Sequence, residues 1–124
     1  LTLSGESLRT LGPRDALIPV GRMAEVVGRY LCGADPADPR ASPLFARFPA
    51  PPPALVAVGG TEALRSDAER IAARLREDGG SVALRVVEGA PHVWPMLDGL
   101  VPEARATLRE AATFLQTSFD SASR

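Results

Sequence analysis

The stretch between Leu55 and His92 constrains the fold of this chain most strongly. Residues 55–60 form a short apolar run that ends in two glycines, as expected of a strand covered on both faces. Residues 68–75 place apolar side chains at helical spacing, and residues 82–86 alternate as a second strand does. Strand, crossover helix and strand form a βαβ unit, which predicts two parallel neighbouring strands with a right-handed crossover.

The predicted helix carries start and stop signals. Ser66 and Glu69 have the Ser-x-x-Glu spacing of a capping box, in which two side chains satisfy free N–H groups at a helix start. Gly79 and Gly80 follow the helix, and glycine accepts the left-handed conformation that ends many helices. The pattern predicts a helix that begins at about Ser66 and ends before Gly79.

Two polar side chains, Glu62 and His92, lie in the loops that follow the two predicted strands. Parallel strands bring their carboxyl ends to one edge of the sheet, where α/β proteins build their sites. His92 is the only histidine of the chain. A lone histidine in a loop can also simply bind a backbone carbonyl, so position alone leaves both interpretations open.

Composition excludes several classes of function. With 124 residues the chain forms at most one small domain, and its net charge of -1 gives no reason to expect a nucleic-acid partner. No apolar run reaches the roughly 18 residues of a membrane span. Cys32 has no disulfide partner, so we expect a reducing compartment and a cytoplasmic location. One histidine and scattered acids make no metal-ligand set, so we expect no metal, and we also expect no cofactor. All 14 basic residues are arginine, a bias typical of a GC-rich bacterial genome.

The remaining segments flank the βαβ unit. Residues 1–14 are expected to form a loop with at most one short turn, and residues 19–31 a helix that stops at Gly33. A turn-rich connector and a proline-rich entry lead into the first strand. A last helix is expected to open at Pro102, and its predicted buried stripe comprises Ala104, Leu108, Ala111, Leu115 and Phe119. The chain thus divides into residues 1–50 and residues 51–124.

Two parallel strands do not make a stable sheet by themselves, because two-stranded sheets are marginal in water. The first predicted strand is apolar enough to need neighbours on both sides. The chain also opens without methionine at Leu1. We therefore expect it to be the C-terminal part of a longer protein, with a missing N-terminal half or another chain, including a second copy in a homodimer, completing the sheet.

Four segments together resemble the hormone-sensitive-lipase-like branch of the α/β-hydrolases, a family of bacterial and eukaryotic esterases. One looks like the segment after the family's sixth strand, one like its Asp-Pro…Ser-Pro connector, one like its acid loop and one like its histidine loop. The resemblance covers essentially the whole chain in the family's order. The four segments are Leu3–Ser7, Asp35–Leu44, Val58–Asp67 and Glu88–Trp94.

The resemblance implies the C-terminal portion of an α/β-hydrolase fold and assigns roles to two residues. Glu62 would be the acid of a Ser-Glu-His triad and His92 its general base. Asp67 is the second choice for the acid, although its place in the first helical turn also suits the helix dipole. Val93 and Trp94 either line a substrate pocket or cover the core beneath the last helix.

The nucleophile is absent from this chain. Neither the Gly-x-Ser-x-Gly elbow nor the His-Gly-Gly-Gly oxyanion motif occurs in the sequence. In the complete enzyme a serine from upstream would attack a small carboxylic ester, and these 124 residues alone are expected to be inactive. The alternative is a truncated, catalytically inactive hydrolase-like module that acts through protein contacts at its exposed strand edge.

Overall fold

The structure, a computed structural model, describes residues 2–122. Leu1, at the start of the predicted segment 1–50, and residues 123–124, at the end of the predicted segment 51–124, lie outside the described residues. Its centre is the expected βαβ unit: strand β1 (Ala54–Gly59), helix α3 (Arg65–Glu77) and strand β2 (Val82–Val87). The strands are parallel and in register from Ala54 opposite Val82 to Gly59 opposite Val87. The predicted βαβ unit is therefore confirmed.

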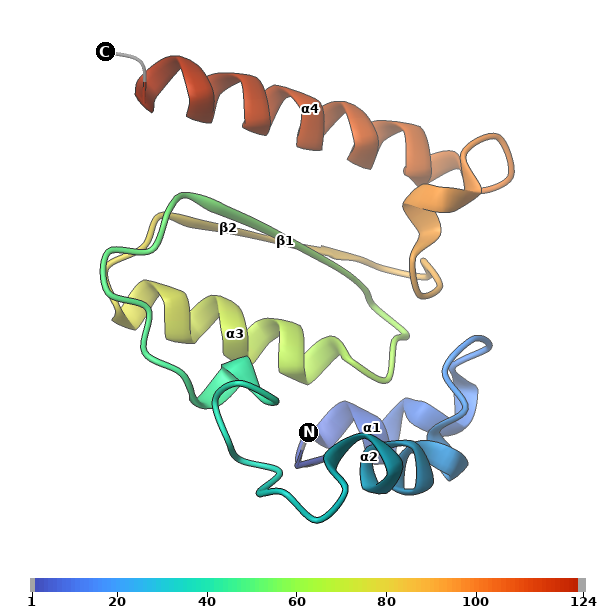
Figure 1. The fold of residues 1–124 in the computed structure, drawn as a ribbon. Coiled ribbons are helices and arrows are strands. Elements are labelled where there is room, and N and C mark those ends of the chain that lie inside the picture. The colour runs from blue at the N-terminus through green and yellow to red at the C-terminus, as the bar shows by residue number, and fades with distance from the viewer. Residues whose placement is uncertain (1, 123–124) are drawn as a thin grey trace.

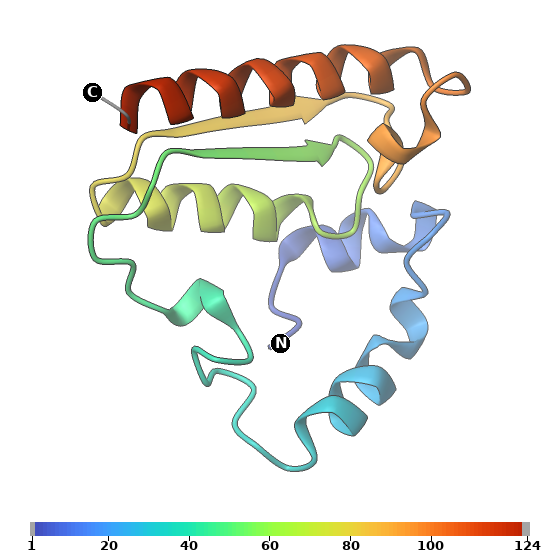
Figure 2. The same cartoon turned by 45° about the horizontal axis from the view of Figure 1, so that its top comes forward.

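Helices cover both faces of this small sheet. Helix α3 lies on one face and α4 (Pro102–Ala122) on the other (Figures 1 and 2). Helices α1 (Glu6–Thr10) and α2 (Met23–Leu31) lie on the α3 side. Short 3-10 turns complete the chain at Gly12–Arg14, Val20–Arg22, Pro43–Phe45 and Trp94–Leu97.

The best-buried apolar cluster joins the loop after β2 to the start of α4. Trp94 is only 1% exposed and packs with Ala90 and Ala104, while Val87 and Val101 lie against this cluster. The indole N–H of Trp94 donates to Thr107 Oγ1 at 3.1 Å. Trp94 thus anchors the segment that carries His92 to the last helix.

Two predictions about the helices need correction. Residues 1–14 contain α1, a helix of 5 residues, where a loop was expected. The capping box does not form: α3 begins at Arg65, and its N-cap Leu64 makes no side-chain cap. Ser66 instead bonds with Ser7, whose hydroxyl accepts the Ser66 N–H at 2.9 Å. A distant residue satisfies the helix start, which local spacing does not reveal.

The predicted buried stripe of α4 is wrong beyond its first turn. Ala104 is fully buried, but Leu108 and Leu115 are 44% and 53% exposed and Phe119 is 69% exposed. A sheet of two strands is too narrow to cover a helix of 21 residues. The helix packs mainly through its N-terminal end, near Trp94.

Candidate active site

The two loops after β1 and β2 lie against each other and bring Glu62 and His92 together. Glu62 Oε2 lies 2.7 Å from His92 Nδ1. The Glu62 side chain is 5% exposed and the His92 ring 30% exposed. A carboxylate only accepts hydrogen bonds, so the ring donates its Nδ1–H to Glu62 and keeps a lone pair on Nε2. This is the tautomer that a general base needs.

Glycine permits the close approach of the two loops. A side chain at Gly59 would overlap the carbonyl oxygen of Ala90, and one at Gly60 would overlap Glu88. The Gly60 N–H donates to Val87 O at 2.8 Å, and Thr61 Oγ1 donates to Ala90 O at 3.3 Å. The two glycines that signalled the end of a strand in the sequence therefore serve the contact between the acid and histidine loops.

The second carboxylate oxygen of Glu62 is also occupied. Oε1 accepts the backbone N–H of Gly59, at the end of β1, at 2.5 Å. With one oxygen on the strand and the other on the imidazole, the acid is fixed in rotation. A buried carboxylate with both oxygens engaged can hold a histidine in a single orientation.

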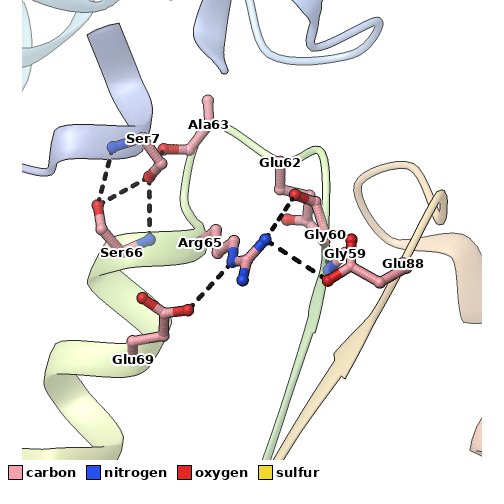
Figure 3. A network of polar contacts seen from close by, with 9 residues as sticks. All are labelled: Ser7, Gly59, Gly60, Glu62, Ala63, Arg65, Ser66, Glu69 and Glu88. Carbon is pink, nitrogen blue, oxygen red and sulfur yellow. Dashed lines mark hydrogen bonds and ion pairs between the residues drawn. The ribbon is translucent and has the colours of Figure 1, made fainter. Parts of the chain in front are cut away.

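Arg65 links the acid loop to the start of the histidine loop (Figure 3). Its Nη1 donates to Gly60 O at 3.2 Å and lies 3.6 Å from Glu88 Oε1. Its Nε donates to Glu69 Oε1 at 3.1 Å, one turn further along α3. The guanidinium thus spans the end of β1, the end of β2 and the start of α3.

Of the other candidate residues, Asp67 lies on the surface of α3, Trp94 is buried, and only Val93 is exposed beside His92. Asp67 bonds to Arg70 at 3.0 Å, on the surface of α3. Trp94 is buried beneath α4, whereas Val93, next to His92, is 43% exposed and adopts a left-handed backbone with φ of 50°. Among residues 2–122 no cluster of histidine, cysteine or acidic side chains is suited to hold a metal ion.

One residue near the site, Asp15, was missed by the sequence analysis. Its Oδ2 accepts the N–H of Ala63, the neighbour of Glu62, at 2.8 Å. Its Oδ1 accepts the N–H groups of Leu17 and Ile18, each at 2.9 Å. The bonds to Leu17 and Ile18 follow a local pattern, because an aspartate side chain often binds backbone N–H groups two residues further on in a turn. Nothing in the sequence signals the bond to Ala63, because that residue is 48 positions away.

Comparison with known proteins identifies the family. Residues 2–96 match the model of a family with the α/β-hydrolase fold. The chain belongs to this family. An acetyl-hydrolase of Streptomyces hygroscopicus is 31% identical over 118 residues, which cover 95% of this chain and 40% of that protein. An esterase of Acinetobacter venetianus is 35% identical over 121 residues, with coverage of 97% and 40%.

Solved structures of this α/β-hydrolase family extend the similarity to three dimensions. An esterase of the bacterial hormone-sensitive lipase family superposes with a TM-score of 0.88 at 34% identity, covering 94% of this chain and 39% of that one. The resemblance to the hormone-sensitive-lipase-like branch is confirmed. The chain spans about 40% of the length of the curated relatives it matches. None of the helices within residues 2–122 has the length and apolar character needed to cross a membrane.

Proposed function

We propose that this α/β-hydrolase chain supplies the acid and the general base of a serine carboxylesterase. The observation that carries the proposal is the bond of 2.7 Å between buried Glu62 and His92 Nδ1. Both residues follow parallel strands at the same sheet edge, in the order acid then histidine that an α/β-hydrolase triad follows. The serine nucleophile and the oxyanion donors come from sequence outside these 124 residues.

In the proposed reaction His92 moves two protons. Its Nε2 accepts the proton of the serine hydroxyl as the serine oxygen attacks the ester carbonyl. It then donates that proton to the departing alkoxide, which leaves as an alcohol, while the acyl group stays esterified to the serine. Water repeats the sequence and releases the carboxylic acid. Glu62 keeps Nδ1 protonated throughout and stabilises the imidazolium that forms in each half-reaction.

We propose small carboxylic esters as the substrates. The printed names of the relatives, an acetyl-hydrolase and an esterase, support this class. Val93, exposed beside His92, is proposed to contact the ester. Trp94, with its buried ring, is assigned to support of the histidine loop.

The test compares this chain with the complete product of the gene that encodes it. Both are assayed with p-nitrophenyl acetate and p-nitrophenyl butyrate. We expect hydrolysis by the complete product, its loss in His92→Ala, and no turnover by the 124-residue chain. Hydrolysis that survives His92→Ala at full rate would contradict the proposal.

The second candidate function is an inactive module that binds another protein chain through strand pairing. The observation that favours it is the two-stranded sheet, because within the described residues neither strand pairs along its outer edge. A gene that encodes only these residues, with a purified product that forms dimers or a stable complex, would support this function. Ester hydrolysis by the complete product would exclude it.

A further inference from the structure

Two side chains from the segment before α2, those of Ser7 and Asp15, form hydrogen bonds with the backbone of the acid loop. Asp15 Oδ2 accepts the Ala63 N–H at 2.8 Å, and Ser7 Oγ donates to the Ala63 carbonyl at 2.6 Å. Figure 3 shows the Ser7 side of this arrangement, with Ser7 and Ser66 also bonded at 2.8 Å. The peptide groups on both sides of Ala63 are thus fixed from outside the loop, directly after Glu62.

Asp15 is itself held rigidly. Its other oxygen accepts the N–H groups of Leu17 and Ile18, so the carboxylate accepts bonds from three backbone donors in total. Ala63 is 1% exposed and Asp15 is half-buried, which limits competition from water for the bond between them. A three-donor arrangement requires a group that only accepts.

The same backbone bonds favour the charged form of Asp15. Burial alone would raise the pKa of Asp15, but the N–H donors of Ala63, Ile18 and Leu17 and the positive charge of His92 lower it below its ordinary value. The bond from Ala63 to Asp15 is therefore charge-assisted, and such bonds are stronger than those between neutral groups.

We propose that Asp15 is a positioning residue for the Glu62–His92 pair: its carboxylate fixes the acid loop through the backbone N–H of Ala63, directly after Glu62. This inference rests on the proposed esterase function for its kinetic consequence, but its structural consequence is independent of that function. Asp15 touches no reacting atom. It acts through the orientation of Glu62 and therefore of the His92 ring.

Two substitutions separate this role from a local turn. Asp15→Asn keeps the shape of the side chain, but its amide NH₂ must face a backbone N–H on one side. Asp15→Ser keeps an acceptor for the turn at Leu17 and Ile18 but is too short to reach Ala63. Asp35→Asn is the matched control, because Asp35 accepts the Ala37 N–H in a similar exposed turn.

The first measurement is a nitrogen-15 NMR spectrum of histidine imidazoles in the complete gene product, with His92→Gln identifying the His92 signals. The wild type and Asp35→Asn are expected to show a single Nδ1-protonated tautomer with a hydrogen-bonded Nδ1–H. Asp15→Asn and Asp15→Ser are expected to show a weakened Nδ1–H signal and a mixture of tautomers. If Asp15→Asn fails to fold, as judged by circular dichroism, Asp15→Ser carries the test.

The second measurement is ester hydrolysis by the same proteins. We expect both Asp15 variants to lose about tenfold to a hundredfold in kcat, since small misplacements of a catalytic group have effects of this size, with KM changed less than about twofold. An unchanged His92 spectrum in folded Asp15 variants would overturn the inference. An inactive wild type would contradict the proposed function, while the NMR comparison would still decide the role of Asp15.

Discussion

At the scale of single residues, Glu62 is defined by the use of both its oxygens. Oε1 accepts the Gly59 N–H and Oε2 accepts the His92 Nδ1–H. In Glu62→Gln an amide NH₂ replaces one of these acceptors. Placed against His92, it demands an unprotonated Nδ1 and therefore the tautomer whose Nε2 cannot act as a base. We expect kcat of the complete product to fall roughly 10³- to 10⁴-fold, as when a triad acid is made neutral.

Asp67→Asn is the matched control for Glu62→Gln, and it also tests the second choice for the acid. Asp67 bonds to Arg70 on the surface of α3 and makes no bond to His92. We expect kcat of this variant to stay within about twofold of the wild type, because a partly exposed i, i+3 pair contributes at most about 1 kcal/mol. A larger loss for Asp67→Asn than for Glu62→Gln would transfer the acid role to Asp67.

Asp78 gives a prediction about pH. It follows α3 and links the segment before β1 to that helix, with Oδ2 accepting the Phe48 N–H at 2.8 Å. This bond lowers the pKa of Asp78 against the opposing effect of burial, and Arg47 and Arg74 lower it further. The folded pKa is below the unfolded value, so the stabilisation is complete above about pH 4 and is lost as the pH falls from there through the folded pKa.

We therefore expect Asp78→Ala to melt at a lower temperature than the wild type at pH 7. The difference should narrow below about pH 4, where the wild-type carboxylate becomes protonated. Thermal denaturation followed by circular dichroism, from about pH 7 down to about pH 2.5, measures it, because this range spans the ordinary aspartate pKa of about 3.9. A difference that widens toward acid pH would contradict this account.

At the scale of elements, the contact between the two loops depends on the absence of a side chain at Gly59. A Cβ there would overlap the backbone carbonyl of Ala90, which cannot rotate away as a side chain can. We expect Gly59→Ala to lower the free energy of unfolding by about 1–3 kcal/mol, as overpacking does, and to lower kcat by separating Glu62 from His92. Urea denaturation and ester hydrolysis measure the two effects.

Gly28→Ala is the control with the opposite sign. Gly28 lies inside α2, and a Cβ at this position would meet nothing within 4 Å other than its chain neighbours and the helix's own backbone. Alanine should therefore raise the free energy of unfolding by about 0.5–1 kcal/mol, since glycine is a poor helix former. Equal effects at the two glycines would indicate that the loop contact contributes nothing.

The elements also show which features can be predicted from sequence. The strands, the intervening helix and the loops of Glu62 and His92 follow from periodicity and glycine positions, because these signals lie within about ten residues of one another. The bonds of Ser7 to Ser66 and of Asp15 to Ala63 join positions 59 and 48 residues apart, and no local pattern encodes them. Local spacing instead suggested a capping box that the structure lacks.

At the scale of the whole molecule, the two-stranded sheet is too small to cover the full length of the helix α4 that packs on it. Strand β1 pairs with β2 along one edge only within the part of the chain that the structure describes. The far part of α4 exposes large apolar side chains, including Leu115 and Phe119. The chain also spans only about 40% of the length of the two relatives compared above. All three observations indicate that the complete protein has a wider sheet. A wider sheet in the complete protein would supply both the missing strand pairing and the serine.

Hydrogen exchange at β1 tests whether another strand pairs there. The N–H groups of Ala54 and Gly60 donate to Ser81 and Val87 on the β2 side. Successive residues of a strand direct their N–H groups to opposite edges, so those of Val56 and Val58 also point toward β2, whereas those of Leu55 and Ala57 point away. In the 124-residue chain we expect slow exchange at Val56 and Val58 and fast exchange at Leu55 and Ala57.

In the complete gene product the amides of Leu55 and Ala57 should become as protected as those of their neighbours, because a further strand would accept their hydrogen bonds. Val56 and Val58 serve as internal controls, since their partners are already within this chain. Fast exchange at Leu55 and Ala57 in the complete product, beside slow exchange at Val56 and Val58, would mean that β1 remains an edge strand. The serine would then have to reach His92 from an element that does not pair with β1.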